Sequence, residues 1–264
     1  MQLKTEFDDE WKYWIWSNVK NGCHKKGIFE ILLRNGFHFD SIKRELGYDP
    51  AAPLTVHNSV SRKLNDMKGV RKVDTDKLEL YELDDFLDHV ECERIIKIST
   101  KNFHASTLSS VEKDKYFRTS FTCSFNSIDA SSEDSKFIQM IDARICNTLG
   151  IPPSYSEPIQ AQRYRVGQEF KPHTDYFSAN EYEQHCKRQG NRTWTFMIYL
   201  NAVEKGGETR MCTIDTEFHP RTGRALAWNN LKRDGSGNPN TLHAGKPVLE
   251  GTKYIITKWF RQNE

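Results

Sequence analysis

The stretch "YRVGQEFKPHTDYF", residues 164–177, places a histidine and an aspartate two positions apart, directly after a run with the composition of a β-strand. Side chains two positions apart on an extended segment point to the same face, so His173 and Asp175 can approach one metal ion. The pair is also compatible with an ordinary polar turn. Two histidines and one carboxylate form the facial set that binds Fe(II) and leaves open positions, so a metal site requires a later histidine.

Three later histidines are candidates for the third ligand. His185 lies in a charged segment and His219 in a turn, whereas His243 lies between a Gly/Asn-rich loop and the last apolar run, and it is the best placed. Lys253 stands in that run, where an unpaired buried ammonium would be costly, so an inward Lys253 indicates an anionic co-substrate. The alternative is that it points to solvent. Lys253 and Lys258 fall on opposite faces of a regular strand, so at most one points inward.

The composition is typical of a folded protein with an aromatic core. Of the 264 residues 37% are hydrophobic and 12% aromatic, a length that allows one large domain or one domain with a small appendage. The net charge of +2, with both signs interspersed, argues against a nucleic-acid partner, and no apolar run approaches membrane-spanning length. The six cysteines are scattered without a CxxC pair, which favours reduced thiols and a cytoplasmic location.

The first fifty residues have the pattern of three short helices, which end near Gly22, Gly36 and Gly47. Asp40 is the expected N-cap of the third helix. We interpret 1–50 as a small helical domain and 51–75 as a connector that contains one further helix.

Three tryptophans of the first helix, Trp11, Trp14 and Trp16, are too many for one narrow apolar stripe, so at least one should lie off the buried face. Two roles are open for the helical domain. It either recognises a protein substrate through exposed aromatic side chains, or packs these tryptophans onto the rest of the protein.

From residue 76 onward the pattern changes. A strand and turn over 77–87 and two helices, over 90–103 and 133–151, precede a region rich in short strands. The strand-like runs are 159–166, 192–201, 207–214, 223–230 and 252–260. We therefore predict an α+β catalytic domain over 76–264, in which helices back a sandwich or barrel.

Four segments together resemble the prolyl 4-hydroxylases, a branch of the 2-oxoglutarate- and Fe(II)-dependent dioxygenases. They are "YRVGQEFKPHTDYF", "GGET", "GRALAWNN" and "LHAGKPVLEGTKYIITKWF", and the resemblance covers about residues 78–264. It implies a double-stranded β-helix (jelly-roll) core and a catalytic set in which His173, Asp175 and His243 bind Fe(II). Lys253 would pair with the distal carboxylate of 2-oxoglutarate.

The resemblance implies further site residues and the reaction. Tyr199 and Thr257 match positions that hydrogen-bond the co-substrate, and Tyr164 matches a pocket tyrosine. The expected enzyme is a procollagen-proline 4-dioxygenase-like prolyl hydroxylase that uses Fe(II), 2-oxoglutarate and O2, with ascorbate as an accessory reductant, and releases succinate and CO2. Its expected partner is a protein or peptide that contains proline.

Substrate residues are also implied by the resemblance. Arg118 and Ser120, in "FRTSF", and Arg192 and Trp259 match positions linked to substrate binding; the alternative for the last two is a surface arginine and a core tryptophan. The chain carries Phe170 and Arg261 where the plant and algal collagen-type enzymes are expected to have tyrosine and histidine, which argues against a collagen-like substrate. The polar segment 177–194 is expected to act as a mobile lid.

Two other functions are open at this point. The same mechanism can hydroxylate a free amino acid or another side chain; a nucleobase is disfavoured, since the base demethylases hold 2-oxoglutarate with paired arginines. The second alternative, from a different class, is a non-catalytic binding module that works through its helical appendage. The intact set of three ligands with Lys253 argues against that module.

Overall fold

The computed structural model describes residues 4–48, 57–106, 117–125, 128–178, 181–186 and 188–264. Its contacts divide the chain into two compact units, a small one formed mainly by Met1–Thr55 and a large one formed by Val56–Lys232 and Ser236–Glu264. Each unit has its own apolar core. Among the residues that the structure describes, no helix combines the length and apolar character needed to cross a bilayer.

The small unit contains three helices, α1 (Asp9–Lys20), α2 (Lys25–Arg34) and α3 (Phe39–Leu46). The N-cap of α3 is His38, whose ring nitrogen accepts from the backbone N–H of Asp40. The prediction that Asp40 caps this helix is therefore wrong, because the helix starts one residue before it and places Asp40 in the first turn.

The core of the small unit consists of apolar side chains from all three helices and the segments beside them. Trp11 and Trp14 pack against this core, whereas Trp16 is 55% exposed and Tyr13 is 67% exposed. The prediction that at least one tryptophan lies off the buried face is confirmed.

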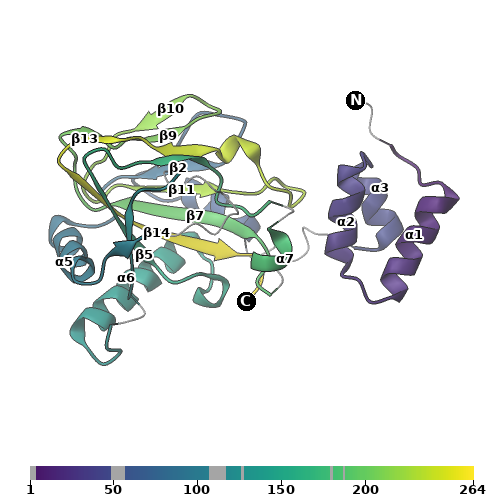
Figure 1. The fold of residues 1–264 in the computed structure, drawn as a ribbon, viewed down its shortest axis with the longest axis horizontal. Helices are drawn as coiled ribbons and strands as arrows, with labels where there is room; N and C mark the ends of the chain where they lie inside the picture. The colour runs from purple at the N-terminus through teal and green to yellow at the C-terminus, as the bar shows by residue number, and fades with distance from the viewer. Residues whose placement is uncertain (1–3, 49–56, 107–116, 126–127, 179–180, 187) are drawn as a thin grey trace. The chain divides into compact units, whose positions relative to one another are not determined.

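The large unit is built on two antiparallel sheets (Figure 1). The eight-stranded sheet has the order β1 (Val70–Lys72), β2 (Leu80–Leu83), β11 (Ala225–Asn229), β7 (Arg192–Tyr199), β14 (Thr252–Arg261), β5 (Gln160–Arg165), β4 (Phe121–Ser124) and β3 (His104–Ala105). The four-stranded sheet has the order β10 (Thr216–Phe218), β9 (Thr209–Met211), β12 (His243–Gly245) and β6 (Phe170–His173). A short pair, β13 (Val248–Glu250) with β8 (Lys205–Gly206), completes the strands that the structure describes.

The two faces of the larger sheet bury different clusters. One face packs with the four-stranded sheet around side chains such as Met197, Tyr199 and Met211. The other face, with Phe196 and Ile198, packs against helices α5 (His89–Thr100) and α6 (Glu133–Leu149), which Figure 1 shows beside the sheet. Alternation along each central strand produces this division. The predicted α+β class with a jelly-roll core backed by helices is confirmed.

Residues 57–75 form part of the large unit, although the sequence suggested a connector up to residue 75. Helix α4 (Val60–Asn65) packs against α6, its Val60 and Leu64 have no exposed surface, and β1 pairs with β2 at the edge of the larger sheet. The large unit therefore begins before residue 76. The expected further helix is α4, and its apolar side chains need the large unit because six residues cannot bury them alone.

Leu64→Ala is expected to destabilise the large unit by about 2–5 kcal/mol, the usual cost of a cavity at a fully buried leucine. Chemical unfolding followed by tryptophan fluorescence measures this change. Arg62→Ala, on an exposed position of the same helix, is the matched control and should change stability by less than about 0.5 kcal/mol. Equal stability of the two variants would show that α4 only connects the units.

Candidate active site

The pairing of β6 with β12 places two histidines opposite each other. His173 ends β6, His243 begins β12, and the two are Cα partners in the antiparallel ladder, with ring centroids 4.2 Å apart. Asp175 lies just beyond β6, with Oδ1 4.0 Å from His173 Nε2 and Oδ2 3.9 Å from His243 Nε2. The three residues predicted to bind metal therefore converge at one point, although Asp175 lies in a bend and not in the strand.

Backbone hydrogen bonds orient both imidazoles. The Nδ1 atoms of His173 and His243 lie 2.8 Å from Lys171 O and 2.9 Å from Thr241 O. A carbonyl only accepts, so each Nδ1 carries the proton and each Nε2 presents its lone pair toward the other ligands. Burial, with the neighbouring His243, lowers the pKa of His173 to about 3, which keeps this ring neutral and ready to bind a metal.

Asp175 is ionised in this setting. Burial opposes its charge, but His243, His173 and Arg192 and the hydroxyl of Thr195 together hold the pKa of Asp175 below its ordinary value. One ligand atom from each of the three residues lies within 4.8 Å of the others. Two imidazoles and one carboxylate are the donor set of non-haem Fe(II) oxygenases, so these residues fit Fe(II).

A narrow pocket between the two sheets opens onto the three ligands. Eight of the predicted site residues line it, and seven residues that were not predicted complete the lining. The predicted ones are Arg118, Tyr164, His173, Asp175, His243, Lys253, Thr257 and Trp259. The others are Gln162, Phe170, Met197, Thr209, Trp228, Gly245 and Ile255. Alternate positions of β5 and β14 supply much of this lining because they face the second sheet.

Lys253 points into this pocket and is 2% exposed. Its Nζ lies 5.4 Å from the ring centroids of both Tyr164 and Tyr199, and none of the described residues offers it a hydrogen bond. Burial lowers the pKa of Lys253 to about 7, while Glu208 acts in the opposite direction. A buried ammonium with so little compensation indicates a site for an anionic ligand group.

Polar side chains extend from Lys253 along the pocket. The hydroxyl of Tyr164 donates to Gln162 Oε1 (2.8 Å), and Gln162 Nε2 donates to Thr257 Oγ1 (3.2 Å). Tyr199 was expected to hydrogen-bond the co-substrate. Its hydroxyl instead donates to Thr209 Oγ1 (2.7 Å), and Tyr199 is not among the residues that line the pocket. The ring of Tyr199 flanks Lys253, and its hydroxyl is engaged within the core.

The predicted substrate residues divide into two groups. Arg118 lines the pocket with its guanidinium 4.9 Å from the ring centroid of Phe170, and that ring stacks on His173 at 3.4 Å. Ser120 is buried and accepts from Arg118 Nε (3.1 Å), so it holds the arginine and does not line the pocket.

Arg192 does not reach the pocket. Its guanidinium donates to both oxygens of Glu157 (2.7 and 2.6 Å) and lies 4.1 Å from the ring centroid of Trp259, which does line the pocket. Arg261 also donates to Glu157 (2.9 Å). Despite burial, the two arginines hold the pKa of Glu157 below its ordinary value. Arg192 is therefore neither a surface arginine nor a lining residue, because the half-buried carboxylate of Glu157 holds it behind Trp259.

The segment expected to form a lid is shorter than predicted, because β7 already begins at Arg192. Its two ends are joined by Asn191, whose side chain accepts from Phe177 N and donates to Phe177 O, both at 2.8 Å. Between them lies the short helix α7 (Tyr182–His185), and residues 179, 180 and 187 are outside the described part. The lid stays a prediction, with Asn191 and Phe177 as its fixed base.

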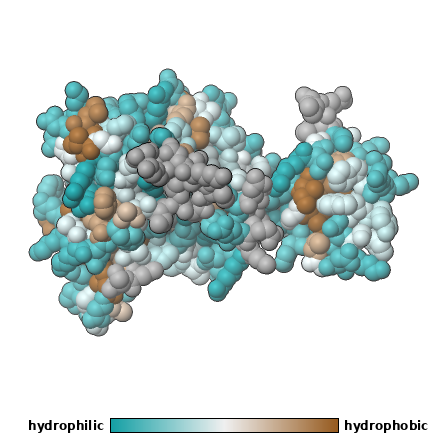
Figure 2. All heavy atoms as spheres, in the orientation of Figure 1, coloured by the Kyte–Doolittle hydropathy of each residue, from teal (hydrophilic) through white to brown (hydrophobic). Residues whose placement is uncertain are grey.

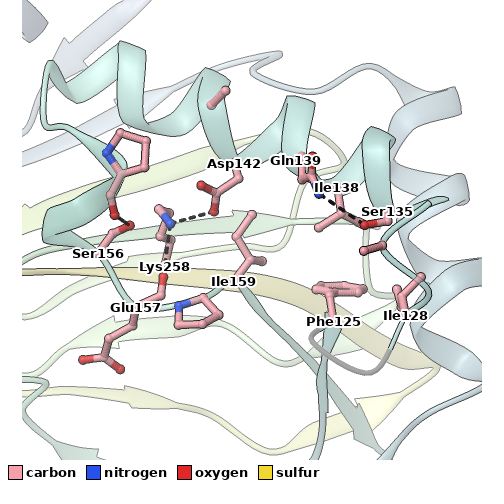
Figure 3. A pocket seen from close by; sticks show the side chains of 14 residues that line it. Phe125, Ile128, Ser135, Ile138, Gln139, Asp142, Ser156, Glu157, Ile159 and Lys258 are labelled. Carbon is pink, nitrogen blue, oxygen red and sulfur yellow. Dashed lines mark hydrogen bonds and ion pairs between the residues drawn. The ribbon is translucent and has the colours of Figure 1, made fainter. Parts of the chain in front are cut away.

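A larger cavity, of about 500 Å³, lies on the other side of β14, against α6 (Figure 3). Lys258 lines it and donates to Asp142 Oδ1 (2.6 Å) and Glu157 O (3.1 Å). Lys253 and Lys258 thus lie on opposite faces of one strand, as predicted, but both are buried. The prediction that at most one of them points inward is wrong, because α6 covers the face of the sheet that carries Lys258. Lys258 has a carboxylate partner and Lys253 has none among the described residues, which separates their roles.

Sequence reasoning missed Gln162, Trp228 and Met197 as pocket residues. Gln162 and Met197 lie two positions from a predicted site residue on the same strand, Tyr164 and Tyr199 respectively, so alternation would have found them. Trp228, whose ring lies 4.9 Å from that of His243, had no such signal, because its contact depends on how the two sheets pack.

Comparisons with known proteins identify similar chains. The profile described as "2OG-Fe(II) oxygenase superfamily" matches residues 159–261. "Probable prolyl 4-hydroxylase 3" of Arabidopsis thaliana is 31% identical over 198 residues, which is 68% of this chain and 68% of the plant protein. "Prolyl 4-hydroxylase subunit alpha-3" of Homo sapiens is 32% identical over 180 residues, 67% of this chain but only 32% of the human protein. The chain therefore spans about a third of that human relative.

A solved structure is also similar to this chain. The viral collagen prolyl hydroxylase from Paramecium Bursaria Chlorella virus-1, in its 2OG complex, aligns with a TM-score of 0.54 and 27% identity. The alignment covers 69% of this chain and 95% of the viral one. A prolyl hydroxylase from Trichoplax adhaerens, 18% identical with a TM-score of 0.51, has the same fold.

Proposed function

Because the chain belongs to the prolyl 4-hydroxylase family of 2-oxoglutarate- and Fe(II)-dependent oxygenases, we propose that it hydroxylates a prolyl residue of a protein or peptide. The reaction consumes 2-oxoglutarate and dioxygen and releases succinate and CO2. The observation that carries this proposal is one pocket that contains His173, Asp175 and His243 together with the buried, uncompensated Lys253. The three ligands account for the metal, and Lys253 accounts for an anionic co-substrate.

In this proposal the chain's own residues bind and orient the reactants. When bound, Fe(II) and 2-oxoglutarate supply the oxidation: the co-substrate loses CO2, one oxygen atom of dioxygen enters succinate, and the other enters a C–H bond of the substrate. Lys253 pairs with the far carboxylate of 2-oxoglutarate. Thr257, which accepts a hydrogen bond from Gln162, lies four residues further along β14 and also lines the pocket. The enclosing sheets exclude water from the reacting groups.

The pocket walls suit a prolyl ring. Phe170, Trp228 and Trp259 supply apolar surface beside the ligands, and Arg118 supplies a cationic donor at the same wall. A mostly apolar wall with few polar groups is the usual form of a pocket for a small saturated ring. Phe170 has no hydroxyl, so this wall lacks a hydrogen bond that a tyrosine would provide, in keeping with a substrate other than collagen.

The test is to incubate the protein with Fe(II), 2-oxoglutarate, ascorbate and proline-containing peptides, and to measure succinate and a mass gain of the peptide. Succinate formation stimulated by peptide, with a gain of one oxygen atom on proline, is the expected result. Stimulation by free proline alone would assign a free amino acid as substrate. Absence of succinate under all these conditions would contradict the enzyme proposal.

The affinity for 2-oxoglutarate is expected to fall as the pH rises above 7. The pKa of Lys253 is about 7 because burial outweighs the opposing effect of Glu208, and the other groups facing its ammonium are the neutral phenols of Tyr164 and Tyr199. The dianion binds the protonated amine and raises its pKa, so the apparent Kd should increase up to about tenfold per pH unit above 7 and stay level below it.

Anaerobic calorimetry in two buffers of different ionisation enthalpy measures this linkage. Binding at pH 8 should take up close to one proton per site, since most Lys253 side chains are neutral in the free protein at that pH. Lys253→Arg, whose side chain stays charged, should lose both the proton uptake and the pH dependence. A Kd that is constant from pH 6 to 9 in the wild type would contradict this assignment.

We further propose that the small helical unit recognises the protein substrate. On α1 the exposed rings of Tyr13 and Trp16 lie 5.9 Å apart, and Lys20 Nζ lies 4.7 Å from the Trp16 ring centroid. Exposed aromatic side chains beside a cation are typical of binding surfaces.

The variant Tyr13→Ala/Trp16→Ala should raise KM for a protein substrate about tenfold or more, the size of a binding hot spot, and leave KM for a short peptide unchanged. Steady-state assays with both substrates measure this. Met140→Ala, exposed on α6 of the large unit, is the control and should change neither value. An equal rise for the short peptide would argue against separate recognition.

A further inference from the structure

A chain of two buried side chains runs behind the carboxylate of Asp175. Thr195 Oγ1 lies 2.7 Å from Asp175 Oδ2, and Asn230 Nδ2 lies 2.8 Å from Thr195 Oγ1. Neither Thr195 nor Asn230 has exposed surface. Of the three ligands, Asp175 depends most on side-chain hydrogen bonds for its position, because it lies beyond the end of β6.

The direction of this hydrogen-bond chain follows from the chemistry of its members. An ionised carboxylate only accepts, so the hydroxyl of Thr195 must give its single proton to Asp175. The oxygen of Thr195 must then accept from the amide of Asn230, which fixes the orientation of that amide. In this orientation Asn230 Oδ1 is buried without a partner among the described residues. The Asn230 amide nitrogen thus donates to Thr195 even though the Asn230 amide oxygen has no hydrogen-bond partner among the described residues.

Both members are held by the backbone of the larger sheet. Thr195 lies within β7, paired with Trp228 of β11 on one side and Trp259 of β14 on the other. Asn230 follows β11, donates from its backbone to Thr193 O (2.7 Å) and accepts from Asn238 N (2.8 Å). Three paired strands therefore fix the position of the Thr195 hydroxyl. Its hydrogen bond in turn fixes the carboxylate of Asp175, which lies in a bend.

We propose that Thr195 and Asn230 are positioning residues that make Asp175 a ligand through one oxygen. Thr195 donates to Oδ2, which lies 3.9 Å from His243 Nε2, whereas Oδ1, 4.0 Å from His173 Nε2, has no hydrogen-bond donor among the described residues and stays open to the metal. A carboxylate that binds through one oxygen leaves more positions for the co-substrate and dioxygen than one that binds through both. The inference rests on the proposed function, and it concerns how the chain prepares the metal site before any substrate binds.

The test measures metal affinity of the metal-free protein, by anaerobic calorimetry with Fe(II) and with Co(II). Thr195→Val keeps the shape but loses the donor, and it should raise the Kd about 10–100-fold, the range found for partners of metal ligands. Asn230→Asp should do the same, because a carboxylate at this position takes the proton of Thr195 away from Asp175. Thr195→Ser keeps the hydroxyl and should stay within about threefold of the wild type.

A matched control separates this role from folding. Thr193, two positions earlier on β7, is equally buried, and its hydroxyl lies 3.0 Å from His57 Nδ1 and bonds Phe260 O (3.2 Å) without touching a ligand. Thr193→Val should lower the melting temperature of the metal-free protein about as much as Thr195→Val, but leave the Kd for Co(II) unchanged. The absorption spectrum of bound Co(II) should change with Thr195→Val and not with Thr193→Val.

The outcomes distinguish the two proposals. If the wild type binds Co(II) and forms succinate while Thr195→Val and Asn230→Asp bind Co(II) as tightly as the wild type, the positioning role is overturned and the proposed function stands. If the wild type binds neither metal, the proposed function fails and this inference fails with it.

Discussion

Replacing His243 by alanine is expected to abolish succinate formation and to weaken metal binding by more than about 100-fold, beyond the effect of losing an outer-shell partner. His243 is 6% exposed, and the register of the ladder fixes it opposite His173, so no neighbouring position of β12 can supply the ligand in its place. The remaining His173 and Asp175 hold a divalent ion as two ligands only. His173→Ala should have the same effect.

Calorimetry with Co(II) and a succinate assay measure the two parts of this prediction. His219→Ala is the matched control, because the ring of His219 is exposed and interacts with Glu208 away from the ligands. That variant should keep wild-type metal affinity and turnover. Full activity in His243→Ala would show that a different histidine completes the site.

Lys253→Met should raise the KM for 2-oxoglutarate about 30-fold or more. Losing one member of a buried charge pair costs about 2–5 kcal/mol, and 2 kcal/mol corresponds to roughly 30-fold in affinity. Metal affinity should stay near that of the wild type, because Lys253 is not a ligand. The variant therefore separates binding of the co-substrate from binding of the metal, which His243→Ala cannot do.

Lys258→Met is the matched control for Lys253→Met. Both lysines lie on β14 and are at most 2% exposed, but Lys258 faces α6 and pairs with Asp142 (Figure 3). Lys258→Met should lower stability, since it breaks a buried pair, and leave the KM for 2-oxoglutarate unchanged. Steady-state kinetics with varied 2-oxoglutarate measure both variants. Equal KM values in all three proteins would remove Lys253 from the co-substrate site.

On the face shown in Figure 2 hydrophilic residues cover most of the described surface, and hydrophobic residues appear as small separate areas. The six cysteines are all free, as expected from their spacing. The pocket between the sheets contains two of the groups whose pKa burial lowers most clearly, His173 and Lys253, and this is where the proposed chemistry takes place.

Several features of the site could be predicted because they depend on short stretches of chain. The spacing of His173 and Asp175 brings two ligands together in any extended segment, and the parity of β14 puts Lys253 and Lys258 on opposite faces. Apolar and aromatic runs predicted the strands in the same way. The resemblance to a known family then supplied the third ligand, His243, which the ladder pairs with His173.

Other features depend on contacts between distant parts of the chain, and here the sequence alone was insufficient. Residues 57–75 look like a polar connector until Val60 and Leu64 meet α6, and Arg192 looks like a surface or substrate residue until Glu157 meets it across 35 positions. Their burial follows from tertiary packing, which local composition does not determine.

The sequence by itself determined the α+β class, the pairing of His173 with Asp175 and the opposite faces of Lys253 and Lys258, because alternation and fixed spacing act within single strands. Only the tertiary structure decided what surrounds them: the walls at Phe170 and Trp228, the removal of Arg192 from the pocket, and the support of Asp175 by Thr195 and Asn230. Those contacts arise from the register between strands and the packing of two sheets. Many side chains far apart in the chain set that register together, so no short stretch encodes it.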